Sequence, residues 1–149
     1  WALYGYTMCY RETKIPEFLQ QAKKVEEFLF NHPHMPTDYV PYWDFDAPEI
    51  PNEPRDASAA AIIASALYEL SLYDPENAER DKERADKILE NLSKNYRATM
   101  GHDNGFLLLH STGTKPTNVE VDVPIVYADY YFIEALLRKD RLEKTGKLF

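Results

Sequence analysis

The sequence predicts an all-α fold with about five helices. Five segments carry apolar residues in helical patterns, and runs rich in proline or glycine separate most of them. A nearly uncharged segment followed across a short turn by an amphipathic one is typical of helical hairpins in inner and outer layers. Because no repeat motif recurs, the pattern favours part of a closed ring of helix pairs over a regular α-solenoid.

The composition describes one globular unit with an acidic surface. Its 149 residues are 44% hydrophobic and 13% aromatic, which is enough to bury the core of about one domain. We therefore expect residues 1–149 to belong to a single domain. The formal net charge of −8 and the absence of a basic stripe argue against a nucleic-acid partner. No apolar run approaches the roughly 20 residues that cross a bilayer, so we expect no membrane partner.

The first two expected helices cover residues 1–12 and 16–31. The first is aromatic and contains Gly5, which suits a buried helix that approaches another element closely. It starts at Trp1 with no capping residue ahead of it, so we expect the natural start to lie upstream and the chain to be a fragment. Pro16 suits the first turn of the second helix, which is amphipathic. Residues 32–54 are rich in proline and aromatic residues, and such a long loop is typical of a binding cleft.

The third and fourth expected helices differ in burial. Asp56 or Ser58 can cap the third, which continues to Leu70 with almost no charge and is expected to be buried all round. Asp74 followed by Pro75 predicts the start of the fourth helix. Its apolar residues, from Ala78 to Tyr96, form one face, which places it on the outside.

The last part of the chain predicts a loop and a final helix. Residues 100–123 contain three glycines and a proline around the short apolar run 106–109, which suits one strand-like piece. Pro124 then opens a helix over residues 127–137, followed by a charged tail with which we expect the chain to end.

Five segments carry a family resemblance: WALYGYTM (1–8), PYWDFD (41–46), DASAAA (56–61), GFLLLH (105–110) and YADYYFIEAL (127–136). In this order they resemble landmarks of family 88 glycoside hydrolases, the unsaturated glucuronyl hydrolases. The resemblance implies an (α/α)6 barrel of twelve helices, of which this chain supplies about the last five. It also implies a bacterial enzyme without a cofactor, in the cytoplasm or the periplasm.

The same resemblance implies the reaction. Such enzymes release 4,5-unsaturated glucuronic acid from lyase-generated oligosaccharides by hydrating the C4–C5 double bond, with an aspartate as general acid and base. The family's two such aspartates lie upstream of Trp1, so the catalytic residues of this chain stay unknown. Asp44, Asp46 and Asp56 are not assigned that role.

Eight residues are candidates for substrate binding, and each also has a structural interpretation. Trp1 matches a family tryptophan beside the sugar, and a core position is an equal alternative. The polar turn of residues 110–115 offers an imidazole, hydroxyls and an ammonium group to the substrate carboxylate, or it is a solvated turn. For Tyr42, Trp43 and Asp44, the alternative is an aromatic loop packed over helix ends. The candidates are Trp1, Tyr42, Trp43, Asp44, His110, Ser111, Thr112 and Lys115.

Other interpretations remain open. The pairs His32 and His34, and His102 and His110, lack the helical spacing of a zinc site, so we expect no metal. Two alternatives to the glucuronyl hydrolase are an unsaturated rhamnogalacturonyl hydrolase acting on pectin fragments and a non-enzymatic helical interaction module. An open arc of five helices would expose the apolar faces of residues 1–10 and 59–70, which predicts self-association.

Overall fold

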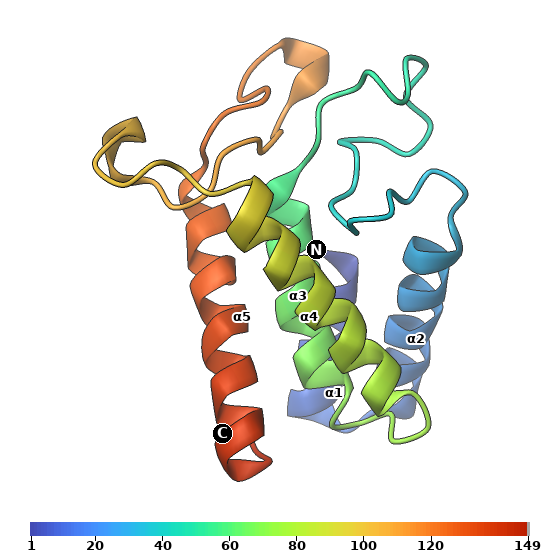
Figure 1. Ribbon diagram of the computed structural model, residues 1–149. Helices are drawn as coiled ribbons and strands as arrows, with labels where there is room; N and C mark the ends of the chain where they lie inside the picture. The colour runs from blue at the N-terminus through green and yellow to red at the C-terminus, as the bar shows by residue number, and fades with distance from the viewer. Residues whose placement is uncertain (149) are drawn as a thin grey trace.

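A computed structural model describes residues 1–148 and contains five α-helices over them (Figure 1). Within this range the backbone forms no strand, and only isolated bridges pair extended segments, such as Tyr42 with Arg55. No helix in the described residues is long and apolar enough to cross a membrane. The all-α prediction is confirmed. The helices are α1 (Ala2–Thr13), α2 (Pro16–Asn31), α3 (Ala57–Leu70), α4 (Ala78–Asn95) and α5 (Val126–Thr145), with short 3₁₀ turns at Asp103–Gly105 and Lys115–Thr117.

The helices form two layers around α3. Helices α1, α4 and α5 all pack against α3, and α2 packs against α1. In Figure 1, α1, α3 and α5 run in one direction, whereas α2 and α4 return in the other. The molecule therefore consists of hairpins with α1, α3 and α5 in one layer and α2 and α4 outside it, which is the predicted alternation.

Helix α3 forms the centre because its residues are mostly alanine and aliphatic, with Glu69 as its one charged residue. Every residue of α3 except Ala59 is buried. Alanines on α3 and the buried Ala128 and Ala135 of α5 allow the two backbones to approach closely. The Asp56 side chain accepts the backbone N–H of Ser58 at 3.0 Å, so the predicted cap is confirmed.

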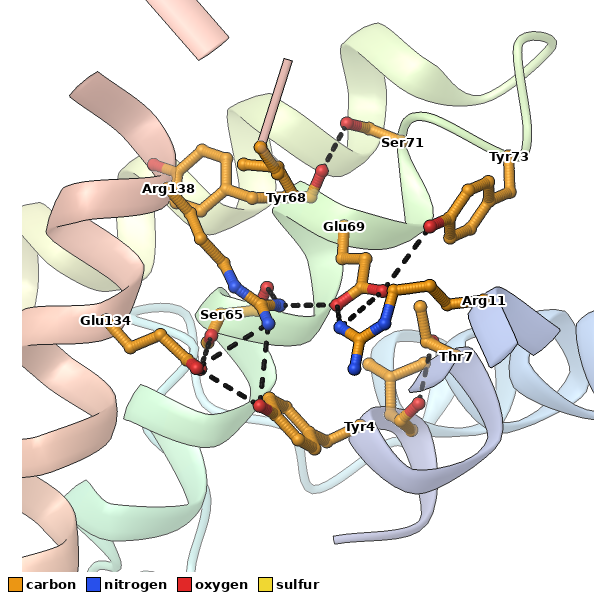
Figure 2. Close-up of polar contacts among 12 residues, drawn as sticks. Tyr4, Thr7, Arg11, Ser65, Tyr68, Glu69, Ser71, Tyr73, Glu134 and Arg138 are labelled. Carbon is orange, nitrogen blue, oxygen red and sulfur yellow. Dashed lines mark hydrogen bonds and ion pairs between the residues drawn. The ribbon is translucent and has the colours of Figure 1, made fainter. Parts of the chain in front are cut away.

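A polar cluster joins the three helices of the inner layer (Figure 2). The buried carboxylate of Glu69 on α3 accepts hydrogen bonds from Arg11 of α1 at 3.2 Å and forms an ion pair with Arg138 of α5 at 2.9 Å. Arg138 also donates to the carbonyl oxygen of Ser65 at 2.8 Å. On the same side, the Tyr4 hydroxyl donates to Glu134 at 3.1 Å. Because each buried charge has a partner, the cluster fixes the register of α1, α3 and α5.

Ion pairs also connect the outer helices. Glu26 of α2 is buried and pairs with Arg84 and, at 3.0 Å, with Arg80 of α4. Lys23 reaches Asp74, just before α4, at 2.9 Å. These contacts connect α2 with α4 and with the turn that precedes it.

Four details of the sequence interpretation are wrong. Helix α4 begins at Ala78, because residues 74–77 form a turn in which Asn77 N–H donates to Asp74 O at 3.1 Å. Gly5 meets no other element, since nothing lies within 4 Å of the place where a Cβ would stand. The charged segment after residue 137 continues α5 to Thr145 instead of forming a tail. The run 106–109 makes a single bridge, Arg97 with Leu108, and no strand.

The exposed apolar surface also differs from the prediction. Residues 60–70 are buried, so the predicted exposure of the 59–70 face is wrong, whereas Trp1 and Met8 of the 1–10 face are 66% and 37% exposed. An apolar stripe runs along α5 instead, at a spacing of three to four residues that places its members on one face. The α5 stripe consists of Val126, Tyr130, Ile133 and Leu137, which are 71%, 61%, 45% and 52% exposed.

Candidate functional site

The two long connections lie together at one end of the helices (Figure 1). Residues 32–56 join α2 to α3, and residues 96–125 join α4 to α5. Helices α1, α3 and α5 begin at this end, whereas the short connections lie at the opposite end. We call it the loop end. All eight substrate-binding candidates belong to these two connections or to the start of α1.

An aromatic cavity of about 320 Å³ opens at the loop end. It brings together Trp1, Tyr42, Trp43 and Asp44, four of the predicted site residues. Apolar side chains of α2, α3 and the 32–56 connection complete its walls, among them Phe28, Phe45, Ala59 and Ile62. Flat aromatic walls with a few polar groups suit the C–H face of a pyranose ring.

Trp1 connects this cavity to the start of α5. Its side chain is 66% exposed, and its ring lies 6.0 Å from that of Tyr127 and 5.2 Å from that of Tyr131, measured between centroids. Burial raises the pKa of the Tyr127 hydroxyl; a hydrogen bond with Ser58 partly offsets this increase, and the charge of Asp56 adds to it. The hydroxyl therefore stays protonated at neutral pH and can donate a hydrogen bond beside the Trp1 ring.

Lys115 is held by a buried carboxylate. Its ammonium group pairs with Oε2 of Glu53, and the same oxygen accepts the indole N–H of Trp43 at 2.9 Å. Lys115 also lies 5.5 Å from the centre of the Trp43 ring. The hydrogen bonds from Lys115 and Trp43 lower the pKa of Glu53. This lysine fixes the wall of the aromatic cavity and is already paired, so its predicted contact with a substrate carboxylate remains a prediction.

The other residues of the polar turn face inward or pair locally. Ser111 and Thr112 are buried, and the Thr112 hydroxyl donates to the carbonyl oxygen of Arg55 at 3.0 Å. The imidazole of His110 contacts Asp122 at 2.7 Å and is about half exposed. The structure therefore does not bring these three residues to the aromatic cavity, and their role in substrate binding stays a prediction.

A second, polar cavity of about 630 Å³ lies on the other side of the 32–56 connection. His110 is the one substrate-binding candidate that lines it. Tyr96 also lines the polar cavity, and burial raises the pKa of the Tyr96 hydroxyl to about 12. The lining consists of Asp38, Asn52, Glu53, Pro54, Arg55, Asn95, Tyr96, His110 and Asp122.

Sequence reasoning missed three residues that shape the site. Glu53 escaped notice because its partner Lys115 is distant in sequence and no local pattern connects them. Tyr127 was assigned to a helix but not to the site. The carboxylate of Asp129 accepts the N–H groups of Leu107 and Leu108, both at 2.9 Å, which ties the 96–125 connection to α5. An acidic residue in a first helical turn was the available signal for Asp129.

Asp44 and Asp56 serve local structure. Asp44 accepts the backbone N–H of Asp46 at 2.9 Å within a turn, although it also lines the aromatic cavity. Asp56 accepts the Ser58 hydroxyl at 2.6 Å in addition to its backbone cap. Within residues 1–148, no group of three or more His, Cys, Asp or Glu side chains is placed to hold a metal ion.

The paired helices with an aromatic cavity at one end define a segment of a layered helical-hairpin protein. No family model matches the chain. It is 50% identical over 143 residues to an unsaturated glucuronyl hydrolase of Formosa agariphila, a match that covers 95% of the chain and 35% of that relative. The chain is homologous to the unsaturated glucuronyl hydrolases and spans about a third of the length of the curated relatives it matches.

Solved structures show the same relationship. An unsaturated glucuronyl hydrolase specific for heparin matches with a TM-score of 0.93 and 46% identity over 97% of this chain and 39% of its own. A Streptococcus agalactiae enzyme, the D175N mutant complexed with dGlcA-GalNAc6S, matches with a TM-score of 0.84 and 29% identity over 93% of this chain and 37% of its own. These neighbours are (α/α)6 barrels, so the predicted fold class is confirmed for the part that is matched.

Proposed function

We propose that this chain forms part of the substrate-binding wall of an enzyme that removes 4,5-unsaturated glucuronic acid from lyase-generated oligosaccharides. The observation that carries the proposal is the aromatic cavity of Trp1 and Trp43, in a chain half identical to an unsaturated glucuronyl hydrolase. The same chain superposes on a heparin-specific member at a TM-score of 0.93. Neither alternative function, the pectin-directed hydrolase or the interaction module, has comparable support.

The proposed reaction is a hydration. A general acid transfers a proton to C4 of the unsaturated sugar, and water, deprotonated by a general base, adds its oxygen to C5. The product is a hemiketal, whose ring opens and releases the neighbouring sugar at C1. One water molecule is consumed, and no redox change occurs.

Residues of this chain bind and orient the sugar in this proposal. The aromatic cavity covers the apolar face of the ring, because the Trp1 and Trp43 side chains offer flat apolar surfaces on which this face can stack. The Tyr127 hydroxyl, beside the Trp1 ring, can donate a hydrogen bond to a ring substituent. The proton-transferring aspartates come from outside residues 1–149, and the chain alone is expected to leave the substrate intact.

The proposed substrates derive from glycosaminoglycans or similar uronate polysaccharides. One structural neighbour is specific for heparin, and another was crystallised with dGlcA-GalNAc6S. The net charge of −8 does not argue against an anionic sugar, because binding depends on the groups local to the cavity.

A chimera tests the proposal. This chain replaces the matching segment of the Formosa agariphila relative, and loss of the absorbance of the C4–C5 double bond is followed with an unsaturated glycosaminoglycan disaccharide. We expect turnover within about tenfold of the relative's own rate, and none by this chain alone. A chimera with the relative's circular dichroism and melting temperature but without turnover would contradict the proposal.

A further inference from the structure

We propose that the polar cavity is a second saccharide site, which binds a neutral sugar unit through its hydroxyl groups. It is distinct from the aromatic cavity, and the choice of a saccharide as its ligand rests on the function proposed above. The cavity volume of about 630 Å³ is within the range of small-molecule sites.

The floor of the polar cavity is organised before any ligand binds. Both carboxylate oxygens of Asp38 are engaged, Oδ1 by Arg55 and by the backbone N–H of Val40 at 3.1 Å, and Oδ2 by the Tyr96 hydroxyl at 3.0 Å. The Nε of Arg55 donates to Val40 O at 2.8 Å. A ligand therefore meets side chains whose positions are already fixed, which lowers the entropy cost of binding.

Other lining residues keep unused hydrogen-bonding capacity. Asn95 donates its amide to Asn91 at 3.1 Å and retains its carbonyl oxygen. His110 Nδ1 contacts Asp122 Oδ1, so Nε2 of the imidazole and the second carboxylate oxygen of Asp122 can still bind a ligand. Among the described residues, the Asn52 side chain has no hydrogen-bond partner. The lining thus offers both donors and acceptors, which matches a sugar hydroxyl, since it both donates and accepts.

The charges of the lining favour a neutral ligand. Three carboxylates line the cavity: Asp38 pairs with Arg55, Glu53 pairs with Lys115, and Asp122 contacts the imidazole of His110. No surplus positive charge is left for an anionic group, and binding a carboxylate or sulfate here would bring it close to three acids.

The position of the cavity fits an oligosaccharide ligand. Tyr42 lines the aromatic cavity, and its partner across the antiparallel bridge, Arg55, lines the polar one. The guanidinium group of Arg55 lies 4.8 Å from the centre of the Tyr42 ring. The two cavities therefore share a wall, so neutral sugars of a bound oligosaccharide are available next to the aromatic cavity.

Saturation-transfer difference NMR tests this site, with chitobiose as the probe. The method observes the ligand, so it can be used even if the chain self-associates. The double variant Asn52→Ala with Asn95→Ala removes two exposed amides from the lining. The matched control is Gln20→Ala with Gln21→Ala, two exposed amides on α2. Trp1→Ala shows whether binding depends on the aromatic cavity. Glucuronate is the anionic probe for comparison with the neutral chitobiose. Circular dichroism checks that each variant is folded.

We expect saturable binding of chitobiose that the double variant weakens at least about fivefold, about 1 kcal/mol at RT near 0.6 kcal/mol. The α2 control and Trp1→Ala should bind chitobiose as the unmodified chain does. In the Trp1→Ala variant, glucuronate should bind more weakly than chitobiose. Absence of saturable binding would overturn the proposal. So would a loss of chitobiose binding caused by Trp1→Ala as large as that of the double variant, or tighter binding of glucuronate to the Trp1→Ala variant.

Discussion

Trp43 donates its indole hydrogen bond at 2.9 Å to Glu53, whose side chain is almost completely buried. The same carboxylate oxygen receives the ammonium group of Lys115. One acidic side chain thus joins the wall of the aromatic cavity to the 96–125 connection. The 32–56 and 96–125 connections are therefore linked through Glu53.

Replacing Glu53 should therefore release Trp43 toward water. In a Trp1→Phe background, where Trp43 is the remaining tryptophan, Glu53→Ala is expected to shift the emission maximum to longer wavelength and to lower the melting temperature. The physical reason is the loss of the acceptor shared by an indole N–H and an ammonium group. Glu27→Ala, at an exposed position on α2, is the control. An unchanged emission maximum in Glu53→Ala would show that the carboxylate does not position Trp43.

The Glu69–Arg138 pair should dominate the stability of the inner layer (Figure 2). Arg138→Met leaves the buried Glu69 carboxylate with only part of its partners, and we expect the free energy of unfolding in urea to fall by about 3 kcal/mol. Combining it with Glu69→Gln should cost at least about 1 kcal/mol less than the sum of the single changes. Lys24→Met, on the exposed face of α2, is the control. Additive effects would show that the pair is not coupled.

Asp81 should make stability depend on pH. Burial raises its pKa to about 6 from an ordinary value of 3.8, with a smaller increase from Asp74, while Arg80 and Lys23 lower it. Because the folded-state pKa is the higher one, the stabilisation is complete below about pH 4 and is lost as pH rises through about 6. A difference of about two pKa units corresponds to about 3 kcal/mol.

The variant Asp81→Asn isolates this effect, since it cannot titrate. Relative to the unmodified chain, it should gain up to about 3 kcal/mol in the free energy of unfolding between about pH 4 and about pH 7. Urea titrations of both proteins across that range measure the gain. A difference between the two proteins that stays constant with pH would contradict the assignment.

The α5 stripe should cause self-association of the chain. Its four apolar side chains are 45% to 71% exposed on one face of α5, and burying such a face is favourable. Ile133→Lys with Leu137→Lys is expected to reduce the sedimentation coefficient to that of a monomer. The same two substitutions at Gln20 and Gln21 of α2 are the control. If the unmodified chain already sediments as a monomer at the same concentration, the prediction fails.

The helices and the loops between them could be predicted from local patterns. Pro16 and Asp56 mark helix starts correctly because a fixed φ angle and a capping carboxylate act within one turn. Asp74 and Pro75 carry the same signal, yet the Asp74 carboxylate is used by Lys23 and by the Asn77 side chain, at 2.9 and 2.8 Å. The helix then starts three residues later. A cap signal cannot reveal a competing partner 51 residues away.

Burial and site geometry were harder to predict because they depend on distant residues. On α5 the large apolar residues Ile133 and Leu137 are exposed, while the buried face contains Ala128, Ala135 and Arg138. The buried face combines small alanines with Phe132 and Arg138, so hydrophobicity alone does not show which face of α5 packs against α3. Trp1 and Trp43 were recognised as site candidates by their type, but their meeting in one cavity depends on how α1 and the 32–56 connection pack.

The most direct test is the kcat/KM of the chimera and of its Trp1→Ala and Trp43→Ala variants on an unsaturated disaccharide, with Gln20→Ala as the control. If the aromatic cavity holds the sugar ring, each tryptophan variant should lose at least about tenfold in kcat/KM, or about 1.4 kcal/mol. The melting temperature of each variant should stay close to that of the chimera. Folded variants that retain the full kcat/KM of the chimera would show that the sugar binds elsewhere.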